Sequence, residues 1–391
     1  MRLAIARRLP SFPNPAFLHR LIQATLTMNS DAKQFLFRLL NTPSPSGFET
    51  EGQKVWMDYV GRFADSLQND AYGNAWATVK GRDPAMSVML EAHADEIGFM
   101  VQNITDDGFL YVTRIGGSDR AIARGKRLKI FGDQGPVLGV LGNTAIHLRN
   151  KEDEKIPEVH QLYVDIGAGS RAEVEQRGLR IGHPAVYTDT AEELIPGRII
   201  GRAIDNRISG FILSQVLANL SLGADKAFVT VHAVNAVQEE IGGSGAKMIA
   251  YRLQPRVAIV LDVTHSTDSP GLDKNKHGSV RIGGGPTLMH GTANHPLVVD
   301  QLIGVARELQ IPIQHEASSR TTGTDTDFVY VSRSGIPSAL LSIPMRYMHS
   351  TVELIDISDV ERCITLLTSF IRKIGNIDEF TPKLGGKNSR L

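Results

Sequence analysis

Three predominantly apolar runs, rich in β-branched residues, restrict most strongly how this chain can fold. They occupy residues 227–237, 257–263 and 338–343. A strand with one solvent-facing side alternates apolar and polar residues, whereas a strand covered on both faces is apolar throughout. We therefore expect these runs to be buried strands of a sheet. Segments with helical periodicity surround them, at residues 32–40, 49–63, 207–220, 297–309 and 357–374. Together these patterns predict an α/β fold.

The α/β pattern is interrupted once by a block of short β-like pieces separated by turn residues. The pieces lie at residues 99–104, 109–115, 127–131, 137–141, 162–166 and 185–188. Strands of this length and spacing are typical of a small antiparallel barrel or sandwich. We therefore predict one α/β domain, formed by residues 28–96 and 201–376, that is split by an inserted β-rich domain at residues 97–200.

The two ends of the chain differ from these domains. Residues 1–27 contain four Arg and no Asp or Glu, which is one property of a transit peptide. Pro10, Pro13 and Pro15 would interrupt the amphipathic helix that such a peptide needs. We expect residues 1–27 to be a non-essential extension, with a transit peptide as the alternative, and residues 377–391 to be a C-terminal tail.

Charge and cysteine content exclude several classes of function. Lys plus Arg and Asp plus Glu both number 42, so the formal net charge is 42 − 42 = 0. A balanced chain lacks the overall positive field of a nucleic-acid or anionic-membrane binder. No apolar run approaches the roughly 20 residues that span a bilayer. The single cysteine, Cys363, excludes an intramolecular disulfide and fits a cytoplasmic location.

Acidic and histidine side chains occur where the predicted strands end or the next helix begins. They are His93, Asp95, Asp205, Glu239, Glu240, Asp262 and His349. Because sites in open α/β sheets collect beyond the carboxyl ends of strands, we expect these side chains to converge. Five carboxylates at close range repel one another and raise each other's pKa values. Two divalent cations about 3.5–4 Å apart, bridged by one carboxylate, would relieve that repulsion.

Each of these residues also has an ordinary explanation when taken alone. Asp205 can cap the helix that follows it. The pair Glu239 and Glu240 can begin a charged helix, and His349 can be a hydrogen-bonded core histidine. The ordered set, rather than any single member, therefore favours a metal centre.

The motifs that contain these residues resemble those of the tetrahedral aminopeptidases, the glutamyl-aminopeptidase-type family of dinuclear metallopeptidases. The resemblance is carried by EAHADEIG at 91–98, GRAIDNR at 201–207, VQEEIG at 237–242, LDVTH at 261–265 and MHSTVE at 348–353. It extends from about residue 28 to residue 374. It implies a mixed-sheet, three-layer catalytic domain of the zinc-peptidase type.

The resemblance also implies a ligand set for two metal ions in each subunit. His93 and Asp262 would hold one ion, Glu240 and His349 would hold the other, and Asp205 would bridge both. The donors are nitrogen and oxygen only, which suits zinc, cobalt or manganese. Related proteins have a cis peptide after the bridging aspartate, so we predict that the Asp205–Asn206 bond is cis.

The reaction implied by the resemblance is removal of the first residue from short peptides with a free N-terminus. A hydroxide shared by the two ions would attack the first peptide carbonyl. Glu239 would be the general base, and Asp95 would orient His93. Thr324 and Asp325 would lie beside the substrate. The inserted β domain would mediate dimerisation, and dimers would build a tetrahedral shell of twelve subunits.

Two other functions remain open at this point. The first is a related two-metal amidase that deacylates N-acylated amino acids, which requires recognition of a substrate carboxylate rather than a free amine. The second is a non-catalytic, metal-stabilised assembly protein, which would not need a base such as Glu239. The sequence assigns no residue to a preference for acidic, basic or apolar first residues.

Overall fold

The computed structural model describes residues 28–151, 154–375 and 380–384. The extension predicted for residues 1–27 lies outside the described residues, as does most of the tail predicted for residues 377–391. Within the tail, Phe380 is buried against the main core. In the described part of the chain, no helix combines the length and apolar character that crossing a membrane requires.

Eight strands form one mixed sheet in the order β1-β2-β12-β3-β13-β16-β14-β15. Their bounds are β1 Ser66–Asn69, β2 Ala75–Val79, β3 Asp83–His93, β12 Val229–Ala236, β13 Val257–His265, β14 Thr287–His290, β15 Gln314–Ala317 and β16 Ser338–Met345. The four central strands β12, β3, β13 and β16 are parallel. Every residue of β16 is buried, and so are nearly all of β12 and β13. The three apolar runs of the sequence are therefore buried strands, as predicted.

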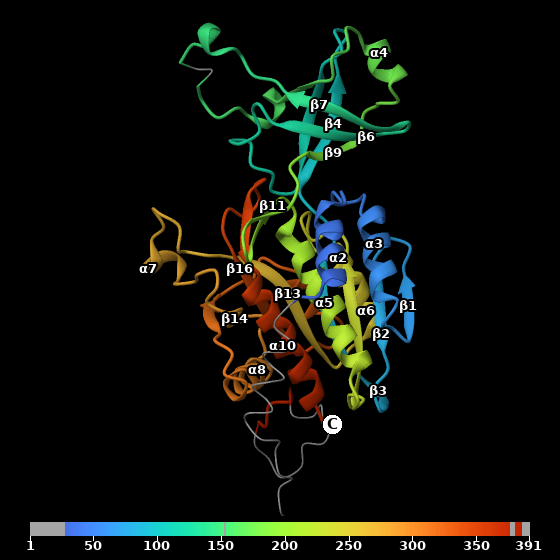
Figure 1. Ribbon diagram of the computed structural model, residues 1–391, viewed down its shortest axis with the longest axis vertical. Coiled ribbons are helices and arrows are strands. Elements are labelled where there is room, and N and C mark those ends of the chain that lie inside the picture. The colour runs from blue at the N-terminus through green and yellow to red at the C-terminus, as the bar shows by residue number, and fades with distance from the viewer. Residues whose placement is uncertain (1–27, 152–153, 376–379, 385–391) are drawn as a thin grey trace, which may run out of the picture.

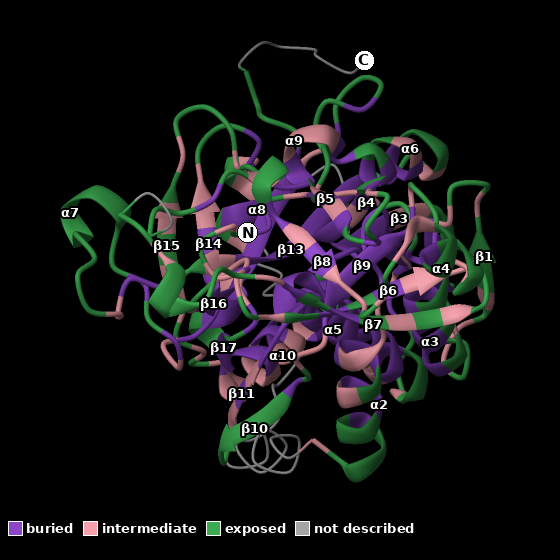
Figure 2. Ribbon diagram, turned by 90° about the horizontal axis from the view of Figure 1, so that it is seen from above, coloured by how far each residue is buried: buried purple, intermediate pink, exposed green. Residues whose placement is uncertain are grey.

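Helices cover both faces of this sheet (Figure 1). One face carries α2 (Ser30–Asn41), α3 (Thr50–Val60), α5 (Ile204–Leu222), α8 (Pro296–Glu308) and α10 (Ile357–Lys373). The other carries α6 (Ser244–Leu253) and α9 (Thr326–Val329). Consecutive strand residues supply the two cores, because Leu341 packs in the first and Leu340 in the second. Figure 2 shows the buried residues concentrated in the central strands and α5. The predicted three-layer α/β fold is confirmed.

Six strands form a separate closed barrel, which lies above the sheet in Figure 1. They are β4 Gly98–Ile104, β5 Leu110–Ile115, β6 Arg127–Gly132, β7 Gly135–Leu141, β8 Tyr163–Asp165 and β9 Pro184–Tyr187. Each coincides with one β-like piece of the sequence, and closure of β4 on β9 makes the insert a barrel rather than a sandwich. Short helices lie in its loops: η1 Ile146–Leu148, η2 Val159–Gln161 and α4 Arg171–Gln176. Phe99, Leu110 and Leu128 lie in a barrel core distinct from those of the sheet.

A three-stranded sheet connects the end of the barrel to the last part of the chain. It contains β10 (Glu192–Ile195), β11 (Arg198–Gly201) and β17 (Glu353–Asp356). Gly201 is paired with Glu353, so the segments that contain Asp205 and His349 lie beside each other. One further helix, α7 (Lys274–His277), lies on a loop that projects from the side of the molecule in Figure 1.

Candidate metal centre and active site

The ends of the central strands bring the predicted acidic and histidine residues together. His93 is the last residue of β3, and Asp262 lies near the end of β13. Glu239 and Glu240 are in the loop after β12, and His349 is in the loop after β16. Parallel strands end at the same edge of a sheet, which explains this convergence.

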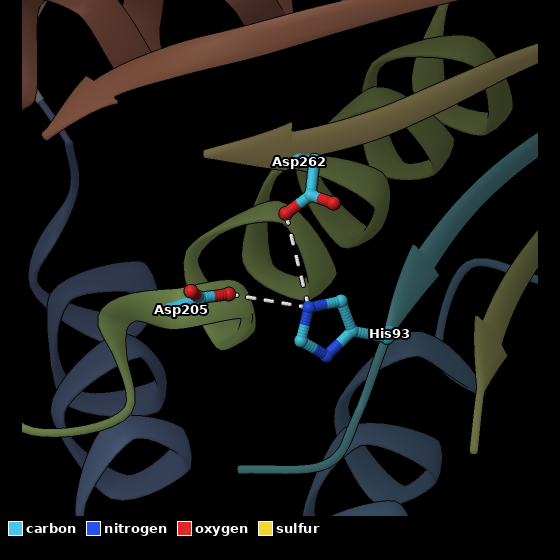
Figure 3. A group of neighbouring side chains, drawn as sticks. All are labelled: His93, Asp205 and Asp262. Atoms are coloured by element: carbon cyan, nitrogen blue, oxygen red, sulfur yellow. Dashed lines mark ion pairs between the residues drawn. The ribbon is translucent and has the colours of Figure 1, made fainter. Parts of the chain in front are cut away.

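The first group of candidate metal ligands is His93, Asp205 and Asp262, all buried. His93 Nε2 lies 3.2 Å from Asp205 Oδ1 and 3.8 Å from Asp262 Oδ1 (Figure 3). One donor atom from each residue lies within 4.8 Å of the other two. An imidazole nitrogen and two carboxylate oxygens are suitable donors for a divalent transition metal.

The second group is Asp205, Glu240 and His349. His349 Nε2 lies 3.5 Å from Asp205 Oδ2 and 3.4 Å from Glu240 Oε2. Asp205 thus belongs to both groups, and its two carboxylate oxygens face different histidines. One carboxylate between two candidate cation positions is the arrangement of a bridging ligand.

Asp205 is held at this position by an irregular helix start. Ala203 has the left-handed φ of 57°, and the Asp205–Asn206 peptide is cis, which confirms that prediction. The Asn206 side-chain amide donates to the carbonyl of Leu261 at 2.8 Å. The Asp205 N–H donates to Glu353 Oε2 at 3.1 Å. These contacts connect the start of α5 to β13 and β17.

Asp95 connects His93 to the loop that contains the two glutamates. The backbone N–H groups of Glu239 and Glu240 donate to Asp95 Oδ1 and Oδ2, at 3.0 and 3.1 Å. Asp95 Oδ1 also lies 3.4 Å from His93 Nδ1, the ring nitrogen that faces away from Asp205. The Ser46 hydroxyl donates to Asp95 at 2.6 Å. Asp95 can therefore position both β3 and this loop.

Glu353 and Ser46 are structural partners that sequence reasoning missed. Glu353 is buried, and its Oε1 accepts the N–H of His349 at 3.0 Å while Oε2 accepts that of Asp205. Glu353 is the last residue of the MHSTVE motif, and that position is the signal for it in the sequence. Its contacts are with backbone N–H groups that the fold brings near it, so the motif alone gave it no role.

The charges of this cluster are unfavourable without a cation. Burial raises the pKa of Glu239 to about 8; the charge of His93 opposes this shift, and those of Asp325 and Asp205 add to it. Burial and the charge of Asp205 likewise raise the pKa values of Glu240 and Asp262 well above their ordinary range.

The histidines shift in the complementary direction. Burial opposes the charged ring of His93, but hydrogen bonds with Asp205 and Asp95 raise its pKa well above the ordinary value. His349 is similar: burial lowers its pKa, and the bonds with Asp205 and the Gly117 backbone raise it overall. The carboxylates beside each histidine thus favour the charged form of its ring.

The residues present fit divalent cations. Glu240 Oε1 is buried and has no hydrogen-bond partner among the described residues. A buried carboxylate oxygen without a partner is costly unless a cation or donor reaches it. Metal binding would release the histidine protons and compensate the carboxylates together.

A cavity of about 760 Å³ opens beside the cluster. His93, Glu239 and His349 line it, together with Thr324. Asp325 is not among the described lining residues; it is 1% exposed. Burial and the charge of neighbouring Glu91 raise the pKa of Asp325 well above its ordinary value. The structure therefore places Thr324, but not Asp325, where it can contact a ligand in the cavity.

Known proteins resemble this chain in sequence over most of its length. The family described as M42 glutamyl aminopeptidase matches residues 73–366. The lysyl aminopeptidase of Pyrococcus furiosus is 34% identical over 354 residues, which cover 89% of this chain and 99% of that protein.

Two solved structures share the architecture. A TET aminopeptidase from a marine sediment Thaumarchaeota archaeon superposes with a TM-score of 0.85 at 30% identity, covering 90% of this chain and 99% of the other. The TET1 peptidase of Pyrococcus horikoshii gives 0.77 at 26% identity, covering 88% and 100%. Because the family match spans most of the chain and the relatives agree in fold, this protein is an aminopeptidase that belongs to the M42 glutamyl aminopeptidase family.

Proposed function

We propose that this chain is a dinuclear, metal-dependent aminopeptidase that removes N-terminal residues from short peptides. The observation that supports this most strongly is the position of Asp205. One of its oxygens faces His93 and the other faces His349, and each histidine has a further carboxylate beside it. We also propose residues 28–96 and 201–376 as the catalytic domain and residues 97–200 as its insert.

His93 and Asp262 would hold one ion, Glu240 and His349 would hold the other, and Asp205 would contact both. The nitrogen and oxygen donors suit zinc, cobalt or manganese. When bound, such a pair supplies Lewis-acid polarisation of a peptide carbonyl and lowers the pKa of water. The remaining steps depend on this chain's own side chains.

Glu239 is the proposed general base. Its Oε2 lies 3.8 Å from His93 Nε2, and its side chain lines the cavity without belonging to either candidate ligand group. Glu239 Oε2 can therefore accept a proton from the attacking water and later deliver it to the leaving amine. Asp95 holds the backbone of Glu239, so it is a positioning residue.

Short peptides are the proposed substrates because of the size and charge of the cavity. A volume of about 760 Å³ lies within the usual range of small-ligand pockets, roughly 300–1,000 Å³. Glu239 and Asp327 line the cavity without belonging to either candidate ligand group, and their carboxylates would attract a substrate's free α-ammonium group rather than an acylated amide. This favours an aminopeptidase over a deacylase.

The decisive experiment is a panel of aminoacyl chromogenic substrates, assayed after chelation and again after addition of zinc, cobalt or manganese. We expect no turnover after chelation, recovery with at least one metal, and no hydrolysis of N-acetylated analogues. Hydrolysis of only the N-acetylated substrates would identify a deacylase instead. Metal binding without turnover of any substrate would indicate a metal-stabilised assembly protein. The same panel reveals the preferred first residue.

We further propose that the chain self-associates through the barrel. The barrel and its loops expose Leu138, Val140, Ile146, Leu148 and Ile156. Exposed apolar side chains that gather on one part of a protein mark interaction surfaces. The Pyrococcus horikoshii TET1 peptidase assembles into a tetrahedron or a large octahedral shell, which supports the same behaviour here.

Light scattering tests this assembly. We expect a particle of about twelve chain masses, and a monomer at micromolar concentration would contradict the proposal.

We also propose a cytoplasmic location, because a chain with one cysteine, Cys363, has no need of an oxidising compartment.

A further inference from the structure

The inserted barrel reaches into the candidate metal centre through the turn after β5. Gly117, in this turn, lines the cavity together with His349. A Cβ atom at position 117 would lie 2.7 Å from His349 Cε1 and closer still to Nδ1, nearer than real Cβ atoms come. The φ of Gly117 is outside the left-handed region, so close approach, rather than backbone conformation, requires glycine here.

The contact with Gly117 involves the ring nitrogen that does not face the carboxylates. His349 Nε2 faces Asp205 and Glu240, and Nδ1 faces Gly117. The backbone of Gly117 lies directly against the Nδ1 side of the His349 ring. A histidine that ligates metal through Nε2 has its proton on Nδ1, and a carbonyl acceptor there fixes both tautomer and ring orientation.

A second residue of the inserted segment, Lys126, holds the loop that contains His349. Lys126, just before β6, donates to Thr351 Oγ1 at 2.7 Å and pairs with Asp189 Oδ1 at 2.9 Å. Thr351 is buried and lies two residues after His349. On the other side, Glu353 accepts the His349 N–H. The loop is therefore held between the barrel and β17.

The turn also packs against another candidate ligand of the same group. A Cβ at Gly116 would lie 3.2 Å from Glu240 Cβ and Oε2, so this backbone closely approaches Glu240. Contacts of the barrel turn thus fall on Glu240 and His349. His93 and Asp262 are instead carried directly by β3 and β13.

We propose that the inserted barrel completes the Glu240–His349 metal position, with Gly117 orienting the His349 ring and Lys126 holding its loop. This inference rests on the proposed dinuclear centre. Gly117 and Lys126 are positioning residues, since they act through His349. The barrel then contributes to metal affinity at one of the two positions, in addition to any role in assembly.

The test is Gly117→Ala, with Gly169→Ala as the matched control. Gly169 also lies in the inserted segment with φ outside the left-handed region, but its Cβ would make only an ordinary 3.8 Å contact with Glu173. Zinc and cobalt binding to the full-length protein, after a chelator has removed its metal, is measured by calorimetry and metal analysis. We expect wild type and Gly169→Ala to bind two ions. In Gly117→Ala the ion at the Glu240–His349 position should bind about 10- to 100-fold more weakly, which is the usual effect of losing a group that orients a ligating histidine.

A second variant, Lys126→Met, keeps the inference testable if Gly117→Ala does not fold. Met retains the aliphatic stem of Lys126 but cannot form the hydrogen bond to Thr351. This variant should lower the metal affinity of the Glu240–His349 position several-fold and leave the affinity of the His93–Asp262 position unchanged. Wild-type affinity for both ions in either folded variant would overturn the inference, as would equal weakening of both. A wild-type protein that binds fewer than two ions would instead overturn the dinuclear centre, on which the inference rests.

Discussion

Glu239→Gln is expected to lower kcat on an unblocked aminoacyl substrate by about 10²–10⁴-fold, the usual contribution of a general base. Gln has nearly the same shape as Glu, but its amide cannot accept the proton of the attacking water. Metal content should stay at the wild-type value, because Glu239 belongs to neither candidate ligand group. The bond between its backbone N–H and Asp95 is also independent of the side chain.

Kinetics and metal analysis on the same preparation distinguish the roles that Glu239 could have. Glu51→Gln is the matched control, since Glu51 is exposed and, among the described residues, its carboxylate forms an ion pair with Lys54 on the surface of the same helix. Its kcat should be unchanged. An unchanged kcat in Glu239→Gln would exclude Glu239 as the base. A lower kcat accompanied by loss of an ion would make Glu239 a ligand instead.

Asp205→Asn should have the largest effect on metal binding. A neutral amide offers one carbonyl oxygen where Asp205 directs two anionic oxygens toward different histidines. We expect both ions to bind much more weakly and kcat to fall to the background rate. At a free metal concentration 100 times Kd, each site of the wild type gains about 2.7 kcal/mol of stability from binding. Thermal unfolding with and without metal should show this gain for wild type and not for Asp205→Asn.

Asp262→Asn provides the matched comparison, because Asp262 belongs to one candidate group only. It should weaken one ion and leave the other bound, so metal stoichiometry separates the two variants. If Asp205→Asn binds two ions with wild-type affinity, Asp205 is not the bridge. If both variants lose the same one of the two ions, Asp205 holds only the ion that Asp262 holds and is not the bridge.

The predicted elements that matched the structure share one property: their order of apolar and polar residues follows which of their faces are buried. The runs at residues 227–237, 257–263 and 338–343 became β12, β13 and β16 because helices cover both faces of these strands. Strand β10 was not predicted, since all four of its residues are exposed and no apolar alternation marks it. The choice of barrel over sandwich depended on the pairing of β4 with β9, which joins segments far apart in the sequence.

In the candidate site, too, some features could be predicted from the sequence and others depended on tertiary packing. Acids and histidines at strand ends could be predicted to converge, because parallel strands end at one edge. Thr324 and Asp325 are adjacent in the sequence, yet only Thr324 lines the cavity. Which of two neighbouring polar residues faces a ligand is decided by the packing of the loop and not by residue type.

The sequence by itself determined the α/β fold with its β insert and the residue types that can hold cations. It did so because apolar periodicity, and an acid or histidine at the end of a predicted strand, are local properties of a chain. Only the tertiary structure decided that Asp205 lies between two histidines, that Glu353 accepts two backbone N–H groups, and that Gly117 contacts His349. Those contacts join residues distant in sequence, and their distances are set by the packing of β17, α5 and the barrel against one sheet edge.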